Sequence, residues 1–387
     1  MSKLETLIRQ LCPDGVEYKK LGDIATITRG GNLQKKDFTD TGIPCIHYGQ
    51  IYTKYGLFAN KTFTFISEQS ASKQKYAEPN DIVMAVTSEN LEDVCKCVAW
   101  LGDVPAAVSG HTAIIHHSQN PKYLCYYFHS GHFQNQKNRM AHGTKVIEVT
   151  PNKLTDILLP VPPLEIQREI VRILDNFTEL TAELTAELTA RKKQYEYYQT
   201  KLFSFGDATV YMPLAEIAEI GTGSSNTNEE LAEGKYPFFV RSQDVRRKNE
   251  YEYDETAIIT SGDGVGVGKI FHYIEGKYAL HQRAYRIHIT DERIIPKYFY
   301  YYMKATFLPY IEKASFHSSV TSIRRPMLNK FPVPVVSIDQ QNRIVSILDR
   351  FDARCNDLTS GLPAEIEARQ KQYEYYRDKL LTFKPLA

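Results

Sequence analysis

Two stretches of this sequence concentrate side chains that bind anions and donate hydrogen bonds to planar polar groups. They are Arg241–Lys248 and Ser318–Arg325, and both are basic, polar and adjacent to apolar runs. Arg and Lys neutralise phosphates or bond guanine, Asn and Gln bond adenine, and Ser and Thr bond phosphate oxygens. Their position predicts loops at the margin of folded domains. Taken alone, such a cluster is more typical of a solvated surface than of a nucleic-acid contact.

The same residue types recur in further short polar segments that we expect to be loops. Glycines at positions 31, 143 and 223 would let the backbone approach a phosphate closely. The complete set of candidate DNA contacts is Arg29, Asn32, Lys35, Lys36, His47, Tyr48, Gln50, Asn90, His111, Thr112, Thr144, Lys145, Ser224, Ser225, Asn226, Arg241, Ser242, Gln243, Arg246, Arg247, Lys248, Gln282, Arg283, Ser318, Ser319, Arg324 and Arg325.

Catalytic motifs are missing. The sequence has no Asp/Asn-Pro-Pro-aromatic tetrapeptide of the adenine methyltransferase type. The glycine-rich Gly262–Ile270 lacks the spacing of a nucleotide-binding loop and has Ile270 where Ser or Thr is needed, so a turn between strands is favoured. Glu275 and Lys277 form a nuclease-like fragment without a convincing upstream partner. We therefore predict no catalytic residues in this chain.

Metal-binding patterns are also incomplete. Cys95 and Cys97 have no second cysteine pair at zinc-site spacing and are interpreted as strand residues. His111, His116 and His117 have no nearby carboxylate or cysteine in the sequence and are interpreted as strand or loop histidines. The sequence thus predicts no metal site.

Composition limits the remaining possibilities. The 387 residues are ample for two domains with their own cores, and the net charge of +1 excludes a cationic field over the whole protein. The six scattered cysteines, with no signal peptide or membrane-length apolar run, suggest a reducing cytoplasm.

The elements that must position these residues occur twice. Pro160–Phe205 and Pro332–Phe383 share a proline entry, an apolar stripe and the identical hexapeptide KQYEYY. Steps of three, four and seven between apolar residues predict long amphipathic helices that hide their stripes in an antiparallel pair. We expect a break at Ser360–Pro363 in the second helix and none in the first. Partner-helix candidates are Tyr195, Tyr198, Leu202, Tyr373, Tyr376 and Leu380.

The globular parts repeat as well. Tyr18–Ala25 matches Tyr211–Ala218, and Pro121–Tyr123 matches Pro296–Tyr298, which predicts a tyrosine-rich helix after each proline. Short apolar runs between turn signals predict β-strands, whereas the centres of the two segments diverge. Residues 2–11 match the end of the first long helix, so we expect the N-terminus beside the C-terminal helix.

At this point the whole chain resembles the specificity subunits of type I restriction–modification systems. The resemblance is carried by both P-x-P entries, by QREIVRILDNF and QNRIVSILDRF, by both KQYEYY blocks and by the LGDI-type starts. The tandem TAEL repeat at Thr181–Leu188 marks one branch of that family.

The resemblance implies an α+β fold with two pseudo-symmetric target-recognition domains of mixed α/β character, joined and separated by two long antiparallel helices. The expected segments are an N-terminal helix (1–15), recognition domain 1 (16–158), a central helical spacer (159–205), recognition domain 2 (206–330) and a C-terminal helical spacer (331–387). The domains are expected to read a bipartite, asymmetric site in double-stranded DNA. Implied partners are two methyltransferase subunits, which modify adenine N6 with S-adenosylmethionine, and two restriction subunits, which use ATP and Mg.

One alternative from another class stays open. A two-domain adaptor with a dimerising coiled coil could bind proteins instead of DNA. Simple gene duplication with structural drift would also explain the repeat, but not why a helix end stays identical while the globular centres diverge.

Overall fold

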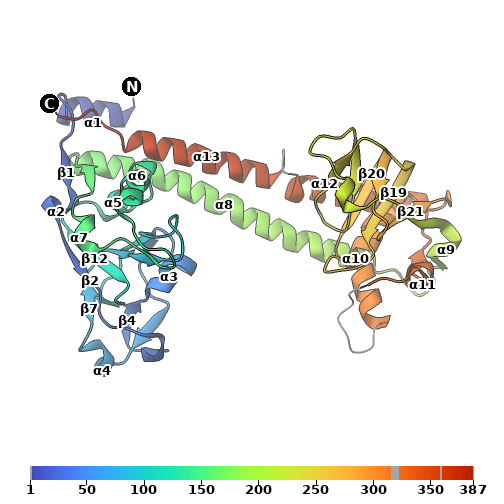
Figure 1. Ribbon diagram of the computed structural model, residues 1–387, viewed down its shortest axis with the longest axis horizontal. Coiled ribbons are helices and arrows are strands. Elements are labelled where there is room, and N and C mark those ends of the chain that lie inside the picture. Colours follow the sequence, from blue (N-terminus) through green and yellow to red (C-terminus); the bar gives the residue numbers. More distant parts are fainter. Residues whose placement is uncertain (1, 315–321, 358–359, 387) are drawn as a thin grey trace. The chain divides into compact units, whose positions relative to one another are not determined.

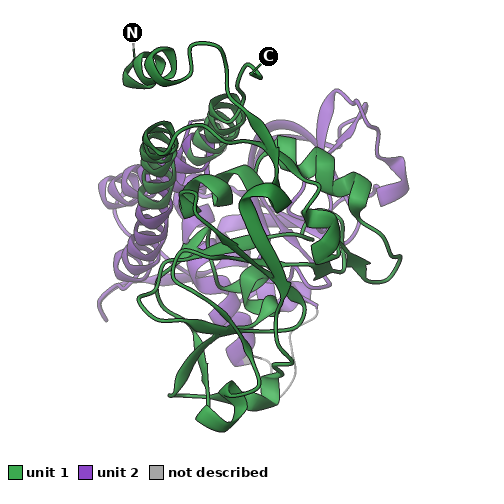
Figure 2. Cartoon of the chain, turned by 90° about the vertical axis from the view of Figure 1, so that its left-hand side faces the viewer, with its two compact units in different colours: residues 1–183, 366–387 green, residues 184–365 purple. Residues whose placement is uncertain are grey.

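The computed structural model describes residues 2–314, 322–357 and 360–386. The chain forms two compact units, unit 1 (residues 1–183 and 366–387) and unit 2 (residues 184–365), drawn in green and purple in Figure 2. Each unit contains one expected recognition domain together with parts of the long helices. Among the described helices, none combines the length and apolarity needed to cross a bilayer.

Unit 1 is built on two five-stranded sheets, ordered β2-β12-β8-β10-β5 and β3-β6-β4-β11-β7. Two short antiparallel pairs, β1-β14 and β13-β9, complete its strands. The strands are β1 (Tyr18–Lys20), β2 (Ala25–Arg29), β3 (Phe38–Thr39), β4 (Ile43–Ile46), β5 (Phe58–Ala59), β6 (Thr64–Ile66), β7 (Lys75–Ala77), β8 (Ile82–Ala85), β9 (Thr87–Ser88), β10 (Cys97–Trp100), β11 (Ala106–Val108), β12 (Thr112–His117), β13 (Ile147–Glu148) and β14 (Leu158–Pro160).

Short helices surround these sheets, and α5 packs against β10. Asn120 caps α5 by accepting hydrogen bonds from the backbone N–H groups of Lys122 and Tyr123, and Pro121 stands at its first turn. The helices are α1 (Lys3–Leu11), α2 (Leu21–Ile24), α3 (Tyr48–Thr53), α4 (Glu68–Ala71), α5 (Pro121–Phe128), α6 (Gly131–Met140) and α7 (Pro151–Leu154), with a 3₁₀ turn η1 (Lys35–Asp37).

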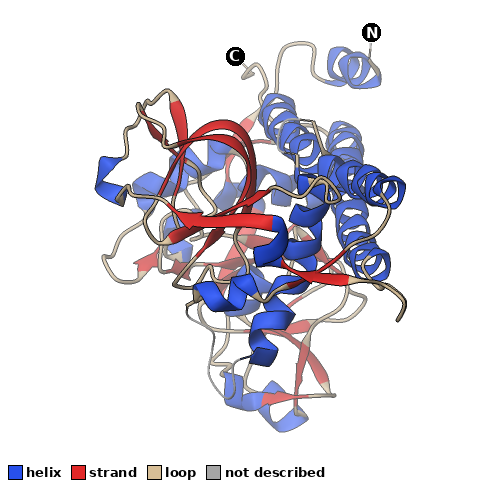
Figure 3. Cartoon of the chain, turned by 90° about the vertical axis from the view of Figure 1, so that its right-hand side faces the viewer, coloured by secondary structure: helices blue, strands red, loops and turns tan. Residues whose placement is uncertain are grey.

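Unit 2 has a six-stranded sheet in the order β16-β21-β19-β20-β17-β18, whose strands are red in Figure 3. The tyrosine-rich helix α10 packs against β19 and β20. The elements are β15 (Tyr211–Pro213), α9 (Leu214–Ile217), β16 (Ala218–Thr222), η2 (Thr227–Glu229), β17 (Tyr236–Phe239), β18 (Arg246–Lys248), β19 (Tyr253–Ser261), β20 (Phe271–Leu280), β21 (Ala284–Ile289), α10 (Pro296–Ala314), α11 (Arg325–Asn329) and β22 (Pro332–Pro334).

The long helices follow the predicted pattern. Helix α8 runs unbroken for 39 residues (Leu164–Leu202), whereas the second copy is divided into α12 (Ile338–Asn356) and α13 (Leu362–Leu380) (Figure 1). The expected break is therefore confirmed. In unit 1 the ring of Phe177 stacks on Tyr376, and in unit 2 Tyr195 and Tyr198 contact Phe351. Together with the ion pair between Glu187 and Arg354, the unit 2 contacts show that α8 and α12 are antiparallel, as predicted.

One buried glutamine repeats in both units and shows that the globular parts share a fold. Gln167 accepts a 3.0 Å hydrogen bond from the N–H of Asn120 and donates one to the carbonyl of Pro162. Gln341 accepts a 2.8 Å bond from the N–H of Ile295 and donates one to Val336. Each glutamine side chain thus joins the segment just before a long helix to the start of a tyrosine-rich helix.

The ends of the chain meet within unit 1. The hydroxyl of Tyr18 bonds the backbone of Phe383, and Val16 pairs with Pro385 in a parallel bridge. Lys3 forms an ion pair with Glu169 of α8. These contacts confirm the expected position of the N-terminal segment beside the end of the last helix.

Several expectations about local structure were wrong. Among the segments expected to be loops, Arg29 ends β2, Tyr48 and Gln50 lie in α3, Thr112 begins β12 and Arg325 begins α11. Residues 246–248 form strand β18 instead of a loop, because they pair antiparallel with β17 at the edge of the sheet. Cys95 lies in a turn with φ of 68°, and only Cys97 belongs to a strand. His116 and His117 lie in β12, His111 lies in the turn before it, and Gly262–Ile270 is the turn between β19 and β20, all as predicted.

Candidate nucleic-acid interface

The same three loops meet in both domains, and we call each meeting point a loop corner. In unit 1 the corner comprises residues 30–34, 47–48 and 109–111, and in unit 2 it comprises residues 223–228, 241–243 and 281–283. A parallel bridge joins Gly31 to Ser109 in the first corner, and the same bridge joins Ser225 to His281 in the second. The N–H groups of Ser109 and His281 bond the ends of the neighbouring strands, at Ile46 and Phe239. The two corners are therefore structurally equivalent.

Glycine is required where the first loop of each corner crosses the next strand. A Cβ on Gly30 would lie 2.1 Å from the carbonyl oxygen of Ser109, and one on Gly223 would lie 1.8 Å from that of Leu280. Both distances are far below van der Waals contact. Gly223 thus lets the loop cross the next strand, and its expected approach to a phosphate stays a prediction.

The second corner exposes two arginines that share one carboxylate. Arg241 lies 2.6 Å from Oδ1 of Asp263, and Arg283 lies 3.3 Å from Oδ2 of the same residue. Asn226, Arg241, Gln282 and Arg283 line an open hollow of about 450 Å³. The Gln282 amide donates a hydrogen bond of 2.5 Å to the Asn226 side chain. Four predicted contact residues from three separate loops are thus brought together.

Charge in this corner is partly balanced. Although partial burial opposes it, the guanidinium groups of Arg241 and Arg283 lower the pKa of Asp263. Burial and the same two arginines lower the pKa of His281. Two arginines facing one carboxylate leave a net positive charge, which attracts an anion. The carboxylate of Asp263 at the same time holds the two guanidinium groups in position.

Glu252 fixes the first loop of this corner. It accepts hydrogen bonds from the N–H of Ser224 at 2.8 Å and from the Ser225 hydroxyl at 2.5 Å. Lys248 donates to that hydroxyl and also pairs with Glu229. The predicted contact residues Ser225 and Lys248 therefore support the loop.

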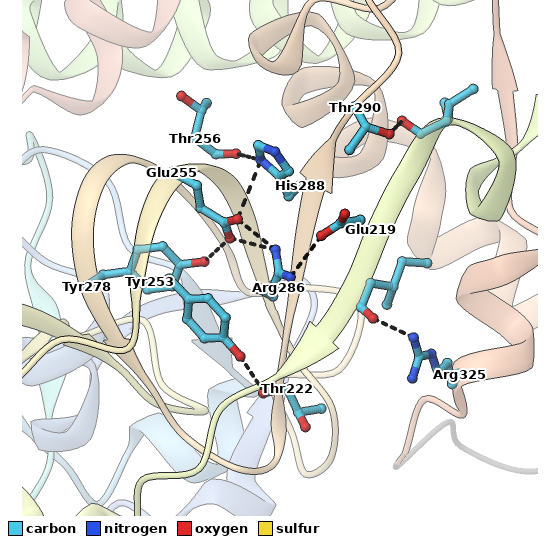
Figure 4. Close-up of polar contacts among 12 residues, drawn as sticks. Glu219, Thr222, Tyr253, Glu255, Thr256, Tyr278, Arg286, His288, Thr290 and Arg325 are labelled. Carbon is cyan, nitrogen blue, oxygen red and sulfur yellow. Dashed lines mark hydrogen bonds and ion pairs between the residues drawn. The ribbon is translucent and has the colours of Figure 1, made fainter.

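A partly buried ion-pair network lies on the sheet next to this corner (Figure 4). Both oxygens of Glu255 accept hydrogen bonds from Arg286, at 2.8 and 2.7 Å, and Oε1 also accepts one of 2.7 Å from Tyr278. The guanidinium lies 4.7 Å from the ring centre of Tyr253, whose hydroxyl bonds the carbonyl of Thr222 at the end of β16. Since β16 leads directly into Gly223, this network orients the first loop. Sequence analysis missed it because its members are spread over three strands.

The first corner has different chemistry. The rings of Tyr48 and His111 lie 4.9 Å apart, and they line a hollow of about 360 Å³ with Asn90. Arg29 bonds the carbonyl of Gly110 at 2.9 Å and forms an ion pair with Glu148. Tyr48, the first residue of α3, and His111 occupy the positions that Arg241 and Arg283 occupy in unit 2. Equivalent corners thus present different hydrogen-bonding groups.

Several other candidates have internal roles. His47 and Gln50 are buried at the start of α3, Thr112 bonds the carbonyl of Ser109, and the Arg325 guanidinium bonds the carbonyl of Ile220 (Figure 4). Arg246 pairs with Glu230. Asn32, Lys35, Lys36, Thr144, Lys145, Ser224, Gln243, Arg247 and Arg324 are exposed, Ser242 is partly exposed, and Ser318 and Ser319 lie outside the described residues.

The tyrosines of the two KQYEYY blocks divide into two sets. Tyr195, Tyr198, Tyr373 and Tyr376 pack against other rings within their units, and Leu202 and Leu380 join the core clusters. Tyr197 and Tyr375 are about 60% exposed, and each ring lies 5.7 Å from a lysine amine, Lys201 and Lys379 respectively. The exposed surface that repeats is thus Tyr197–Lys201 and Tyr375–Lys379, which the candidate set did not include.

The loop corners and the repeated helix surface together define a class of protein. It is a two-domain chain whose equivalent polar corners differ in chemistry and whose exposed helix surface occurs twice. The family model of the type I restriction modification DNA specificity domain matches residues 13–191 and again 208–368. The type I restriction enzyme EcoR124I/EcoR124II specificity subunit of Escherichia coli is 32% identical over 99% of this chain and 98% of its own length. A putative specificity subunit of Haemophilus influenzae is 28% identical over 95% and 96%.

Solved structures agree in fold. The type I restriction–modification S subunit from M. genitalium superposes with a TM-score of 0.61 at 16% identity, covering 95% of this chain and 96% of its own. A chain from a study of complex assembly in the type I system gives 0.64 at 18%, covering 96% and 98%. The chain therefore belongs to the family of type I restriction–modification DNA specificity proteins.

Proposed function

We propose that this chain is the non-catalytic specificity subunit of a type I restriction–modification complex. Its two loop corners read the two parts of a bipartite target in double-stranded DNA. The observation that best supports this proposal is that equivalent corners present Arg241 and Arg283 in one domain and Tyr48 and His111 in the other. Reading two different half-sites requires this combination of one scaffold and two sets of hydrogen-bonding groups.

The second corner is suited to guanine. Arginine donates two parallel hydrogen bonds to O6 and N7 of guanine in the major groove. Asn226 and Gln282 beside it offer the amide groups that pair with adenine. Exposed cations outside the hollow, including Arg247 and Lys36, supply phosphate contacts that carry no sequence information.

The duplicated helix surface supports the assembly part of the proposal. Tyr197–Lys201 and Tyr375–Lys379 present the same exposed groups twice, which suits two copies of one methyltransferase subunit. Those subunits would bind S-adenosylmethionine and methylate adenine N6, and two restriction subunits would use ATP and Mg. The complex would act on cytoplasmic DNA.

A gel-shift titration with the chain and its cognate methyltransferase subunit tests DNA reading. Changing Arg283 or Arg241 to Ala should cost about 1–3 kcal/mol on the cognate site, or roughly a 5- to 150-fold loss of affinity. Lys330→Ala, an exposed cation in the same unit, is the control and should bind normally. A complex without salt-sensitive, sequence-selective binding would favour the protein-binding adaptor instead.

A further inference from the structure

Three metal-ligating side chains converge in unit 1, away from the loop corner. Sγ of Cys97 lies 3.8 Å from Sγ of Cys125, and Nδ1 of His129 lies 3.9 Å from each sulfur. Cys97 begins β10, Cys125 lies in α5, and His129 follows one turn later at the end of that helix. Both thiols are buried and the imidazole is partly exposed. Within the described residues, this is the group of three that could hold a metal ion.

The spacing fits one ion of the size and softness of zinc. A point equidistant from the corners of a triangle with sides of 3.8, 3.9 and 3.9 Å lies about 2.2 Å from each corner. Zinc bonds sulfur at about 2.3 Å and imidazole nitrogen at about 2.0–2.1 Å, and its tetrahedral angles separate two sulfurs by about 3.8 Å. The donor atoms therefore already stand near the separations that coordination requires.

The second domain shows that the fold does not need these side chains. Aligned on Pro121 and Pro296, Cys125 corresponds to Tyr300 and His129 to Lys304. There the ring of Tyr300 packs on Tyr273, and Lys304 lies over the Tyr300 ring. In the second domain, the equivalent contact between helix and sheet is thus formed by aromatic packing. The two thiols and the imidazole are therefore specific to the first domain and are not required by the fold.

The hydrogen bonds of the cluster show which protons a bound metal ion would have to displace. Nδ1 of His129 lies 2.8 Å from the carbonyl oxygen of Cys125, and Sγ of Cys125 lies 2.9 Å from that of Leu57. Coordination would move the imidazole proton to Nε2, and each thiol would release its proton to solvent. One Zn²⁺ would gain two thiolates and one imidazole, with a water molecule completing the tetrahedron through the partly exposed histidine side.

We propose that Cys97, Cys125 and His129 bind one zinc ion, which fastens α5 to β10 in the first recognition domain. The proposal departs from the sequence-based prediction of no metal site. It is also separate from DNA reading, so it stands or fails without reference to the proposed function.

Metal analysis of the full chain, purified without chelators under reducing conditions, tests the proposal. Elemental mass spectrometry should find about one zinc per chain in the wild type, and none in Cys97→Ser or Cys125→Ser. Cys95→Ser is the matched control, because Cys95 is buried two residues away and outside the cluster. Circular dichroism of each variant shows whether it is folded.

A second readout covers the case in which the cysteine variants do not fold. Adding Co²⁺ to the chelator-treated wild type should produce near-ultraviolet thiolate-to-cobalt absorption at one equivalent, and Zn²⁺ should abolish it. His129→Asn should weaken cobalt binding while retaining the fold. Zinc-free protein without this absorption, or a mass lower by two hydrogens from a Cys97–Cys125 disulfide, would overturn the proposal.

Discussion

The hydroxyl of Tyr301 donates a 2.6 Å hydrogen bond to Oδ1 of Asp349, which joins the tyrosine-rich helix α10 to α12. In unit 1 the hydroxyl of Tyr126 makes the same bond, 2.7 Å long, to Asp175 of α8. A lysine pairs with each aspartate, Lys297 with Asp349 and Lys122 with Asp175. Each globular domain is thus held on its long helix by the same three side chains.

Tyr301→Phe should lower the free energy of unfolding by about 1.5 kcal/mol, because it removes a buried hydroxyl's hydrogen bond to a charged group. Chemical denaturation of the full chain measures the change. Tyr197→Phe removes an exposed hydroxyl from α8 and should change stability by less than about 0.5 kcal/mol. Equal effects of the two variants would show that the bond to Asp349 contributes nothing.

The sequence predicted this framework because its signals are local and repeated. Apolar spacing indicated α8, and Gly361 with Pro363 indicated the break between α12 and α13. The loop corners were predicted only as separate loops. Nothing in the sequence shows that Arg241 and Arg283 share Asp263, or that Cys97 lies against Cys125, because strand register and helix packing bring these residues together.

Acid should weaken the attachment of the N-terminal helix through Glu169. Hydrogen bonds from Arg172, opposed by burial and assisted by Lys3, lower the pKa of this carboxyl from its ordinary 4.5 to about 2. A lowered pKa stabilises the fold above the unfolded value, so this contribution is complete above about pH 4.5 and is lost as the pH falls toward 2.

Unfolding measured across this range should show wild type more stable than Glu169→Gln above pH 4.5, with the difference shrinking as the pH falls. The exposed Glu183→Gln, in the middle of the same helix, is the control and should follow the wild type. A difference that is constant with pH would contradict the charge-based account.

The exposed tyrosines of the repeated helix surface should govern assembly. Tyr197→Ala combined with Tyr375→Ala removes both exposed rings, so the chain should bind fewer methyltransferase subunits than the wild type. Native mass spectrometry gives the stoichiometry, and each single variant should weaken one of two sites. The solvent-exposed Glu183→Gln again serves as the control. Two subunits bound at unchanged affinity by the double variant would remove this surface from the interface.

Lengthening α8 should lengthen the unread gap in the DNA target. One additional Thr-Ala-Glu-Leu unit after Leu188 adds about 6 Å of helix and about 40° of rotation beyond one turn. Since DNA rises about 3.4 Å per base pair, we expect the gap to grow by about one base pair while both half-sites stay the same. Methylation mapping tests this, with Ala182→Ser as a variant of unchanged length. An active insertion variant with an unchanged gap would show that the helix does not set the spacing.

Domain exchange combined with methylation mapping tests the central claim most directly. Residues 17–158 are replaced by the corresponding segment of another family member, and the chain is expressed with its methyltransferase subunit. Sequencing the methylated adenines should then show one half of the bipartite target replaced, with the other half and the gap unchanged. A change in both halves, or methylation that does not depend on this chain, would contradict the account of two independent reading domains.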